Sequence, residues 1–235
     1  MCTVTFVRSG NQKIITSNRD EQVVRQAIEP RIYTIGNKRI AFPKDPKAGG
    51  TWYASDEVGN VLVLLNGAAE THKRTPPYQK SRGIIFLEIF SADVPITAWR
   101  EISLDNIEPF TLLLFQEDGI FQMRWNGQDK DLITCDNTEH HIWSSATLYA
   151  KEIRETRKKW FTEFMKDKIS ITPEEMFDFH RHTQPDNKQD GLIIDREGFL
   201  KTISITQTIL GDGQLAMKHF DLVDQITSEV AYEIL

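Results

Sequence analysis

The sequence has little cysteine and no long apolar run, and both absences narrow the class of protein. Only two cysteines, Cys2 and Cys135, occur in 235 residues, which excludes a disulfide framework and a thiolate zinc site. No run approaches the roughly 18 apolar residues of a membrane-spanning helix. The most apolar window, residues 83–90, is interrupted by Glu88. We therefore expect a protein without a membrane span, in which both cysteines are thiols.

The sequence also lacks a basic excess and a secretory signal. The first residues contain no basic segment followed by a long apolar stretch, so we expect a cytoplasmic location. The 28 Lys and Arg residues are outnumbered by 34 Asp and Glu, which gives a net charge of −6. General attraction to nucleic acid or anionic lipid is therefore not expected. The most basic stretch, residues 151–168, is diluted by acidic residues and is typical of a solvated helix face.

The composition is that of a globular protein with a sizeable core. Hydrophobic residues make up 40% of the chain and charged residues 26%, which excludes a disordered tail, a collagen-like fibre and a coiled coil. No internal repeat, low-complexity tract or flexible linker divides the sequence. We therefore expect one domain over residues 1–235.

Alternation of apolar and polar residues predicts strands in the first two-thirds of the chain and again at its end. Residues 2–8 and 13–17 form an N-terminal hairpin in this interpretation, and residues 60–65 are apolar almost throughout, as in a strand buried on both faces. The other strands are expected at residues 32–35, 39–42, 50–54, 111–116, 120–125, 130–135, 192–195, 199–210 and 214–220.

Helical periodicity occupies the middle of the chain. Helices are expected at residues 81–90, 94–102 and 146–167. The run Thr-Pro-Glu-Glu at residues 172–175 predicts a further helix start, because threonine caps, proline suits the first helical position and the second glutamate closes a capping box. Strands, helices and strands again favour a layered α+β fold.

Cys2 is the first residue to which the sequence gives a chemical role. If methionine aminopeptidase removes Met1, Cys2 carries a free α-amine beside its thiol. An α-amine titrates near pH 8 and a thiol near 8.5, so one residue then supplies both a base and a nucleophile. Taken by position alone, Cys2 is more typical of a small apolar residue that begins a buried strand.

The run Asn18-Arg19-Asp20-Glu21 ends the strand that pairs with the strand of Cys2. A hairpin with a short turn brings the end of its second strand beside the start of its first, so Arg19 and Asp20 should lie close to Cys2. Arg19 would lower the pKa of the thiol, and Asp20 would hold the α-amine. An ordinary ion pair or an Asx turn explains the two residues taken alone; their combination with Cys2 favours a site.

Two later segments contribute polar groups. Gly49-Gly50-Thr51-Trp52 places adjacent glycines at the start of a strand, which permits close backbone approach or a positive φ. Asn66 follows a buried strand, and its amide is suited to donate to an oxyanion. An ordinary turn at Asn66-Gly67 is the alternative explanation.

The histidines and the remaining glycines predict no further site. His140-His141 and His180-Arg181-His182 do not have the spacing of ligands on one helix face, and no cysteine or carboxylate cluster accompanies them. Gly211-Asp212-Gly213 lacks the strand–loop–helix context of a phosphate loop and predicts a hairpin turn. Cys135 is expected to pack in the core. We expect neither a metal nor a cofactor.

Four motifs together resemble a known family. Met-Cys-Thr at the start and the motifs at residues 18–21, 49–52 and 81–83 occur in the order and spacing of the NRDE family, which is the family of the transport and Golgi organisation 2 protein and its bacterial relatives. Residues 143–149 and 204–207 are similar to segments of bacterial members. The resemblance covers most of the chain.

This resemblance implies an N-terminal-nucleophile (Ntn) hydrolase fold, a four-layer αββα sandwich. It also implies a distant likeness to the branch of choloylglycine hydrolase, penicillin V acylase and isopenicillin N acyltransferase, whose nucleophile is an N-terminal cysteine. Carried over to this sequence, the resemblance makes Cys2 the nucleophile, with Arg19 beside it and Asp20 near the amine. Asn66 matches an oxyanion-hole position. The residues expected to bind substrate are Asn18, Gly50, Thr51, Trp52 and Ser144.

Three features depart from that branch. The branch usually has one more residue between its arginine and aspartate. Ser144-Ser145 stand where it has a second asparagine. No arginine is evident around Asp190-Gly191, where it has a late arginine.

Two functions therefore remain open from the sequence. The first is an N-terminal-cysteine amidohydrolase or acyltransferase that forms a thioester between Cys2 and a small amide or acyl substrate. The second is a non-catalytic carrier or interaction protein of the same fold, with an apolar groove that handles haem or acyl lipid. The missing asparagine and arginine motivate the second, and the sequence sets neither the substrate nor the oligomeric state.

Overall fold

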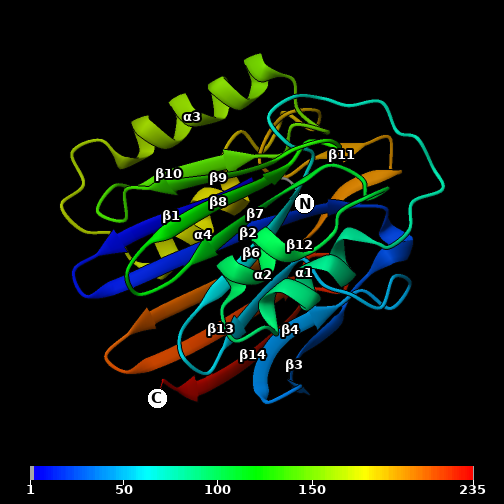
Figure 1. Cartoon of the computed structure of the whole chain (residues 1–235). Coiled ribbons are helices and arrows are strands. Elements are labelled where there is room, and N and C mark those ends of the chain that lie inside the picture. Colours follow the sequence, from blue (N-terminus) through cyan, green and yellow to red (C-terminus); the bar gives the residue numbers. More distant parts are fainter. Residues whose placement is uncertain (1–2, 235) are drawn as a thin grey trace.

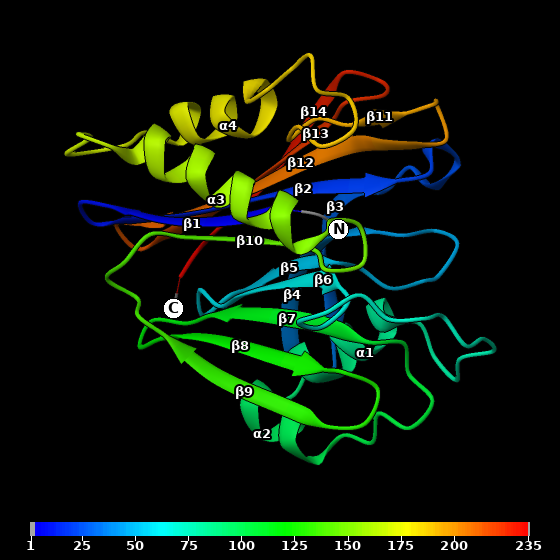
Figure 2. The same cartoon turned by 90° about the horizontal axis from the view of Figure 1, so that it is seen from above.

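The chain forms two antiparallel sheets between two pairs of helices (Figure 1). The computed structural model describes residues 3–234; Met1, Cys2 and Leu235 lie outside the described residues, so the predicted nucleophile is not placed. Figure 2 shows the layers edge-on: α3 (Lys151–Met165) and α4 (Pro173–His182) cover the first sheet, and the second sheet packs beneath it. Helices α1 (Arg82–Phe90) and α2 (Pro95–Glu101) lie on the outer side of the second sheet. The predicted αββα layering is confirmed.

The first sheet has the strand order β10-β1-β2-β12-β13-β14, with β11 paired to β12. Its strands are β1 (Thr3–Ser9), β2 (Gln12–Glu21), β10 (His141–Ser144), β11 (Asp195–Arg196), β12 (Leu200–Gly211), β13 (Gln214–Asp221) and β14 (Ile226–Glu233). The predicted N-terminal hairpin is β1 and β2, in which Thr3 pairs with Asn18 and Ser9 with Gln12. The pairing of β2 with β12 places this hairpin inside the sheet.

The second sheet is a meander in chain order, from β3 to β9. Its strands are β3 (Ile28–Ile35), β4 (Lys38–Lys44), β5 (Tyr53–Asp56), β6 (Val61–Asn66), β7 (Phe110–Phe115), β8 (Ile120–Trp125) and β9 (Lys130–Cys135). The five apolar residues at the start of β6 are all buried, as the sequence predicts for a strand covered on both faces.

The helices are α1 (Arg82–Phe90), α2 (Pro95–Glu101), α3 (Lys151–Met165) and α4 (Pro173–His182), with a short 3₁₀ turn at Val23–Arg25. The predicted capping box at the start of α4 is present: the Thr172 hydroxyl accepts from the backbone N–H of Glu175, whose carboxylate accepts from the N–H of Thr172. None of the helices within residues 3–234 has both the length and the apolarity needed to span a bilayer.

The alternation of β2 divides its side chains between two cores. Ile15 faces the second sheet and joins the large core between the sheets, whereas Ile14 faces the helices and packs with Phe161 of α3 and Phe179 of α4. The middle of β2 is buried on both faces, so a polar side chain there loses free energy unless it finds a partner inside the protein.

Several boundaries differ from the prediction. The strand expected at residues 50–54 begins at Tyr53, because Gly49 has a φ of +75° and the Thr51 hydroxyl turns back to the carbonyl oxygen of Pro43. The helix expected from residue 146 begins at Lys151. The strand expected at residues 192–195 is reduced to the two residues of β11.

Strands β10 and β14 are absent from the sequence-based prediction. Strand β10 has only four residues, all of them half-buried, so it shows no alternation. Strand β14 alternates, but it carries charged residues and lies at the edge of its sheet with Ile226 exposed. Both strands exist because a neighbouring strand offers them backbone hydrogen bonds, which a sequence window does not contain.

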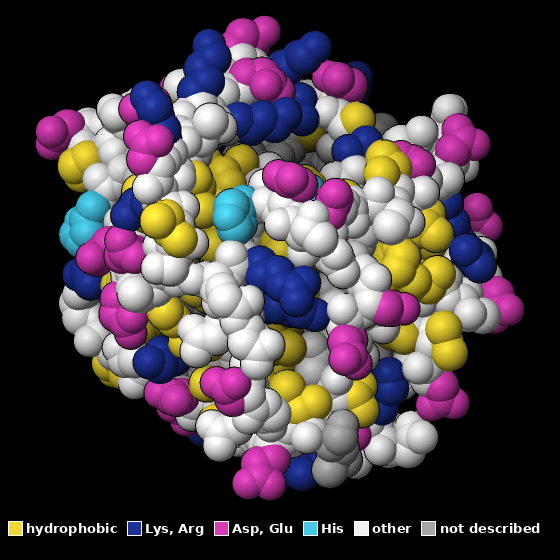
Figure 3. Space-filling view, turned by 90° about the vertical axis from the view of Figure 1, so that its left-hand side faces the viewer, with side chains coloured by type: hydrophobic (Ala, Val, Ile, Leu, Met, Phe, Trp, Pro, Cys, Tyr) yellow, Lys and Arg dark blue, Asp and Glu magenta, His cyan; other side chains and the backbone are white. Residues whose placement is uncertain are grey.

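The end face seen in Figure 3, which looks from the left-hand side of Figure 1, mixes basic, acidic and apolar side chains. No patch of one charge dominates this face.

His180 of α4 joins that helix to the first hairpin. The imidazole is fully buried and lies 2.8 Å from the Thr5 hydroxyl and 2.6 Å from Oδ1 of Asn18. Since the amide oxygen only accepts, Nδ1 carries the proton, and Nε2 accepts from the Thr5 hydroxyl. Burial, and secondarily the charge of Arg157, lowers the pKa of His180 to about 3.

This buried histidine predicts a loss of stability in mild acid. The unfolded chain binds a proton at His180 near pH 6.5 and the folded chain only near pH 3, so the free energy of unfolding falls as the pH is lowered between these values. From pH 7 to pH 5 the loss at this residue is about 2 kcal/mol. Urea unfolding of the wild type and of His180→Gln at both pH values measures it.

The wild type should lose about 2 kcal/mol more than His180→Gln over this interval. His182→Gln is the matched control, because His182 lies on the same helix and its side chain is 63% exposed. Equal losses in the wild type and in His180→Gln would show that the histidine is not held neutral.

Candidate active site

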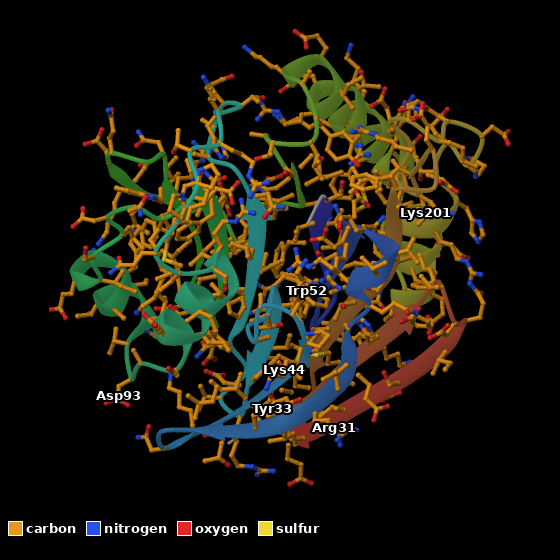
Figure 4. The ribbon with its side chains drawn as sticks, turned by 90° about the vertical axis from the view of Figure 1, so that its right-hand side faces the viewer. Arg31, Tyr33, Lys44, Trp52, Asp93 and Lys201 are labelled. Carbon is orange, nitrogen blue, oxygen red and sulfur yellow. The ribbon has the colours of Figure 1, made fainter. Side chains whose placement is uncertain are left out.

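A cavity of about 360 Å³ opens between the two sheets, at the end of the molecule where β2 and β6 end. Figure 4 looks onto the right-hand side of Figure 1, where Trp52 lies between the sheets. Residues from β2, from the segment before β5, from the end of β6 and from the start of α1 line the cavity. Among them are five of the residues that the sequence predicts for the site: Arg19, Gly50, Thr51, Trp52 and Asn66.

Arg19 is a buried cation in the wall of this cavity. Its guanidinium stacks on the Trp52 ring at 3.9 Å from the centroid and donates to the carbonyl oxygen of Arg25 at 2.7 Å. It also pairs with Asp45 at 3.3 Å. Asp45 is fixed in turn, because its other carboxylate oxygen accepts from the backbone N–H groups of Lys47 and Ala48. Asp45 also pairs with Arg25, so this one carboxylate serves two guanidinium groups. The Arg19 cation is therefore held in one position, with its charge only partly compensated.

Asp20 lies on the opposite face of β2 from Arg19. Its carboxylate accepts hydrogen bonds from the Tyr149 hydroxyl at 2.5 Å and from the Thr202 hydroxyl at 2.6 Å, and the residue is 2% exposed. Asp20 is not among the residues that line the cavity. The side chains of these two neighbouring residues thus point to opposite sides of the first sheet, as strand alternation requires.

Arg157 of α3 completes the surroundings of Asp20. Its guanidinium stacks on the Tyr149 ring at 3.6 Å and donates to the Thr3 hydroxyl at 2.5 Å. It also donates to the carbonyl oxygens of Asp190 and Gly191. A chain of contacts therefore runs from Asp20 through Tyr149 and Arg157 to Thr3, the residue that follows Cys2 in sequence.

No arginine is evident in the sequence beside Asp190-Gly191, yet the structure brings two there. Arg157 of α3 donates to the carbonyl oxygens of both residues, and Arg196 of β11 pairs with the Asp190 carboxylate at 3.3 Å. Most of the basic stretch is exposed or half-buried, as in a solvated helix face, whereas Arg157 within it is 1% exposed. The charge pattern of a helix does not reveal which of its basic residues faces the sheet.

Asn66 ends β6 on the far side of the cavity from β2. Its carbonyl oxygen accepts from the Ser145 hydroxyl at 2.7 Å and from the N–H of Thr147. Its half-buried side-chain amide makes no hydrogen bond with any residue of the described range 3–234. The backbone of Asn66 is thus anchored while its amide donors have no acceptor among these residues, which suits an oxyanion-binding role.

Asn18 and Ser144 are not part of the cavity wall. The Asn18 amide is fully buried and donates to the carbonyl oxygens of His180 and Leu192, so it serves the junction with α4. Ser144 lines a separate hollow of about 120 Å³ and lies 3.4 Å from the Thr3 hydroxyl. Both remain predicted substrate contacts, without a place in the cavity described here.

The sequence-based prediction misses a second group of charges on the cavity wall. Arg74 and Arg82 both pair with Glu108, at 3.1 and 3.2 Å, and Lys80 lines the same wall. Burial is the main cause that lowers the pKa of Arg82, opposed by the charge of Glu108. Only the Ser81-Arg82-Gly83 motif gave a sequence signal here, and it did not identify Glu108.

Gly50 and Gly83 allow the wall to close. A Cβ atom on Gly50 would lie 2.5 Å from the carbonyl oxygen of Gly83, and one on Gly83 would lie 2.8 Å from that of Thr51. Neither position has room for a side chain. Gly50 and Gly83 thus allow the segment before β5 to lie against the start of α1. This close approach explains why each of the two motifs contains a glycine at that position.

Gly50→Ala should therefore lower the free energy of unfolding by about 3 kcal/mol, because backbone of α1 must move to admit the methyl group. Gly213→Ala, in the turn between β12 and β13, is the control. Its Cβ would meet nothing within 4 Å, and only its positive φ costs roughly 1 kcal/mol. Denaturant unfolding of both variants checks this, and equal losses would contradict the close approach.

Two solved structures with a similar fold are hydrolases. The chain is similar to a Caenorhabditis elegans N-acylethanolamine-hydrolysing acid amidase orthologue, with a TM-score of 0.61 and 9% identity over 88% of this chain and 92% of that one. It is also similar to a variant of the conjugated bile acid hydrolase of Clostridium perfringens, with a TM-score of 0.61 and 10% identity over 97% and 92%. At such identities the likeness shows the fold, and the predicted Ntn-hydrolase sandwich is confirmed.

No curated protein sequence matches the chain. A sequence model of one family, described as Transport and Golgi organisation 2, matches residues 1–213. The predicted resemblance is thereby confirmed over almost the whole length, and the chain belongs to the Transport and Golgi organisation 2 family.

Proposed function

We propose that the chain is an N-terminal-cysteine amidohydrolase or acyltransferase that acts on a small amide or acyl substrate through a thioester on Cys2. The observation that carries the proposal is the meeting of Arg19 and Asn66, from different sheets, in the wall of one cavity. Cys2 is joined by one peptide bond to Thr3, and the backbone of Thr3 pairs with Asn18, the neighbour of Arg19. The fold, shared with two amide hydrolases, supports the same chemistry.

Removal of Met1 is the first requirement of this mechanism, since it frees the α-amine of Cys2. The amine takes the thiol proton, and the thiolate attacks the substrate carbonyl carbon. The positive charge of Arg19 favours the thiolate. In the tetrahedral intermediate, the amide N–H of Asn66 donates to the oxyanion.

Collapse of the intermediate breaks the carbon–nitrogen bond of an amide substrate. The leaving amine takes the proton from the α-ammonium of Cys2, and the acyl group stays on sulfur as a thioester. Water, or a second amine, then attacks the thioester and gives a proton to the α-amine. The carbon–sulfur bond breaks, and the Cys2 sulfur takes that proton from the α-ammonium, which restores the thiol. The product is a carboxylic acid in hydrolysis and a new amide in acyl transfer.

Asp20 acts in this proposal as the group that positions the amine. Its two oxygens are already oriented by Tyr149 and Thr202, so the carboxylate cannot rotate freely. Tyr149 is itself fixed under Arg157, which also binds the Thr3 hydroxyl. The same network therefore orients the carboxylate and the backbone that follows the nucleophile.

The character of the cavity favours an enzyme over a carrier. A haem or acyl-lipid carrier needs an apolar groove, whereas eight charged residues line this cavity: Arg19, Glu21, Arg25, Asp45, Arg74, Lys80, Arg82 and Glu108. A polar wall suits a small substrate with hydrogen-bonding groups. No feature of the described residues favours the carrier to the same degree.

Cys2→Ala should abolish release of amine from any N-acyl substrate that the wild type hydrolyses. A panel of N-hexanoyl amino acids and amines, with the released amine measured by fluorescence labelling, identifies such a substrate. Cys135→Ala is the matched control, because Cys135 ends β9 at the far edge of the second sheet. Full activity of Cys2→Ala, or no turnover of any member by the wild type, would overturn the proposal.

Asn66→Ala should lower kcat by about 10²–10³ with little change in KM, because the oxyanion forms only in the transition state. Steady-state kinetics with the same substrate separate the two constants. Ser145→Ala tests the anchor separately, since it removes the hydroxyl that holds the Asn66 carbonyl and leaves the amide in place. An unchanged kcat in Asn66→Ala would remove this residue from the mechanism.

A further inference from the structure

The cavity wall has the opposite charge balance from the rest of the chain. Five basic side chains line it, those of Arg19, Arg25, Arg74, Lys80 and Arg82, against three acidic ones, those of Glu21, Asp45 and Glu108. The whole chain has 28 basic against 34 acidic residues. A positive cavity in a negative protein concentrates anions at one place and repels them elsewhere.

The excess positive charge gathers on the wall formed by Arg74, Lys80 and Arg82, which we call the basic wall. Glu108 is the only carboxylate in the cavity lining that pairs with it, and it is shared between Arg74 and Arg82. Lys80 pairs with Glu88, which does not line the cavity. One carboxylate therefore faces two guanidinium groups, and the wall retains capacity for a further anion.

Two buried side-chain atoms of the cavity lining have no hydrogen-bond partner within residues 3–234, and both are donors. Trp52 is 4% exposed, yet its indole N–H has no acceptor anywhere in residues 3–234. The Nε–H of Arg25 is buried and likewise has no acceptor in that range. An unpaired buried N–H costs free energy, and a ligand oxygen would satisfy it.

The start of α1 adds a third source of positive potential. Ser81, Arg82 and Gly83 line the cavity, so the first turn of this nine-residue helix faces it. The Ser81 hydroxyl accepts from the N–H of Ile84. The N–H groups that precede Ile84 have no partner within the helix, and the helix dipole favours an anion beside them.

We propose that the substrate carries an anionic oxygen group, a carboxylate or a phosphate, which binds at the basic wall while its amide lies at Asn66. This inference rests on the proposed function and names the class of substrate for that site. Guanidinium groups bind either anion through paired N–H donors. The same cavity wall disfavours a cationic or a purely apolar substrate, because a cation would meet the uncompensated charge and an apolar group would leave the donors unpaired.

Matched substrates test the proposal. N-hexanoylglycine carries a carboxylate and N-hexanoyl-phosphoethanolamine a phosphate, whereas N-hexanoylglycinamide and N-hexanoylethanolamine are their neutral counterparts. The wild type should turn over at least one anionic member with a kcat/KM about tenfold or more above its neutral counterpart. Comparison of the two anions shows which one the wall prefers.

Arg74→Gln should remove most of this preference through an increase in KM for the anionic members. The Arg74 side chain is 67% exposed, so its replacement should not disturb folding. Lys73→Gln is the matched control, because Lys73 is exposed, adjacent and absent from the cavity lining. Preference retained by Lys73→Gln and lost by Arg74→Gln would place the anion at the basic wall.

Calorimetric titration of Cys2→Ala with the same four compounds separates the two proposals. Binding of an anionic member to Cys2→Ala, with no turnover by the wild type, supports the anion site and overturns the proposed function. Turnover without any preference for the anionic members supports the function and overturns the anion site. Equal binding of charged and neutral members would also overturn the anion site.

Discussion

The burial of the Arg19 guanidinium is the constraint on which the geometry of the cavity depends. A buried cation without a partner costs several kcal/mol, and here Asp45, the carbonyl oxygen of Arg25 and the face of Trp52 meet that cost together. Arg25 lies in the connection from β2 to β3, and Asp45 and Trp52 lie in the connection from β4 to β5. One side chain of β2 thus fixes the chain that leaves the first sheet and the chain that enters β5, and the cavity forms between them.

The next residue of β2 produces the second half of the arrangement. Asp20 points to the helical layer and is held by Tyr149 and Thr202, and Arg157 links Tyr149 to Thr3. A central strand with two buried faces can thus carry a cation toward one layer and a carboxylate toward the other, each with its own partners. In our proposal, both act on the residue before Thr3, one on its thiol and the other on its amine.

Much of this could be predicted from the sequence where the signal is local. The N-terminal hairpin, the buried strand β6 and the capping box of α4 follow from alternation, apolar runs and cap chemistry, and the motifs led to the family and its layering. The prediction that Arg19 and Asp20 lie close to Cys2 did not assign the two residues to opposite faces of β2, although the alternation of the strand implies it. Arg157 and Glu108 could not be predicted, because their partners lie far away in the chain and nothing in a charge pattern distinguishes a buried arginine from a solvated one.

The central claim is that Cys2 is a processed and activated nucleophile. Its most direct test is the intact mass of the untagged protein, before and after reaction with a stoichiometric amount of iodoacetamide. The account predicts loss of Met1 and rapid labelling confined to Cys2, with Cys135, whose thiol pKa is raised by burial, left unmodified. A retained Met1, or labelling of Cys2 no faster than that of a free thiol, would contradict it.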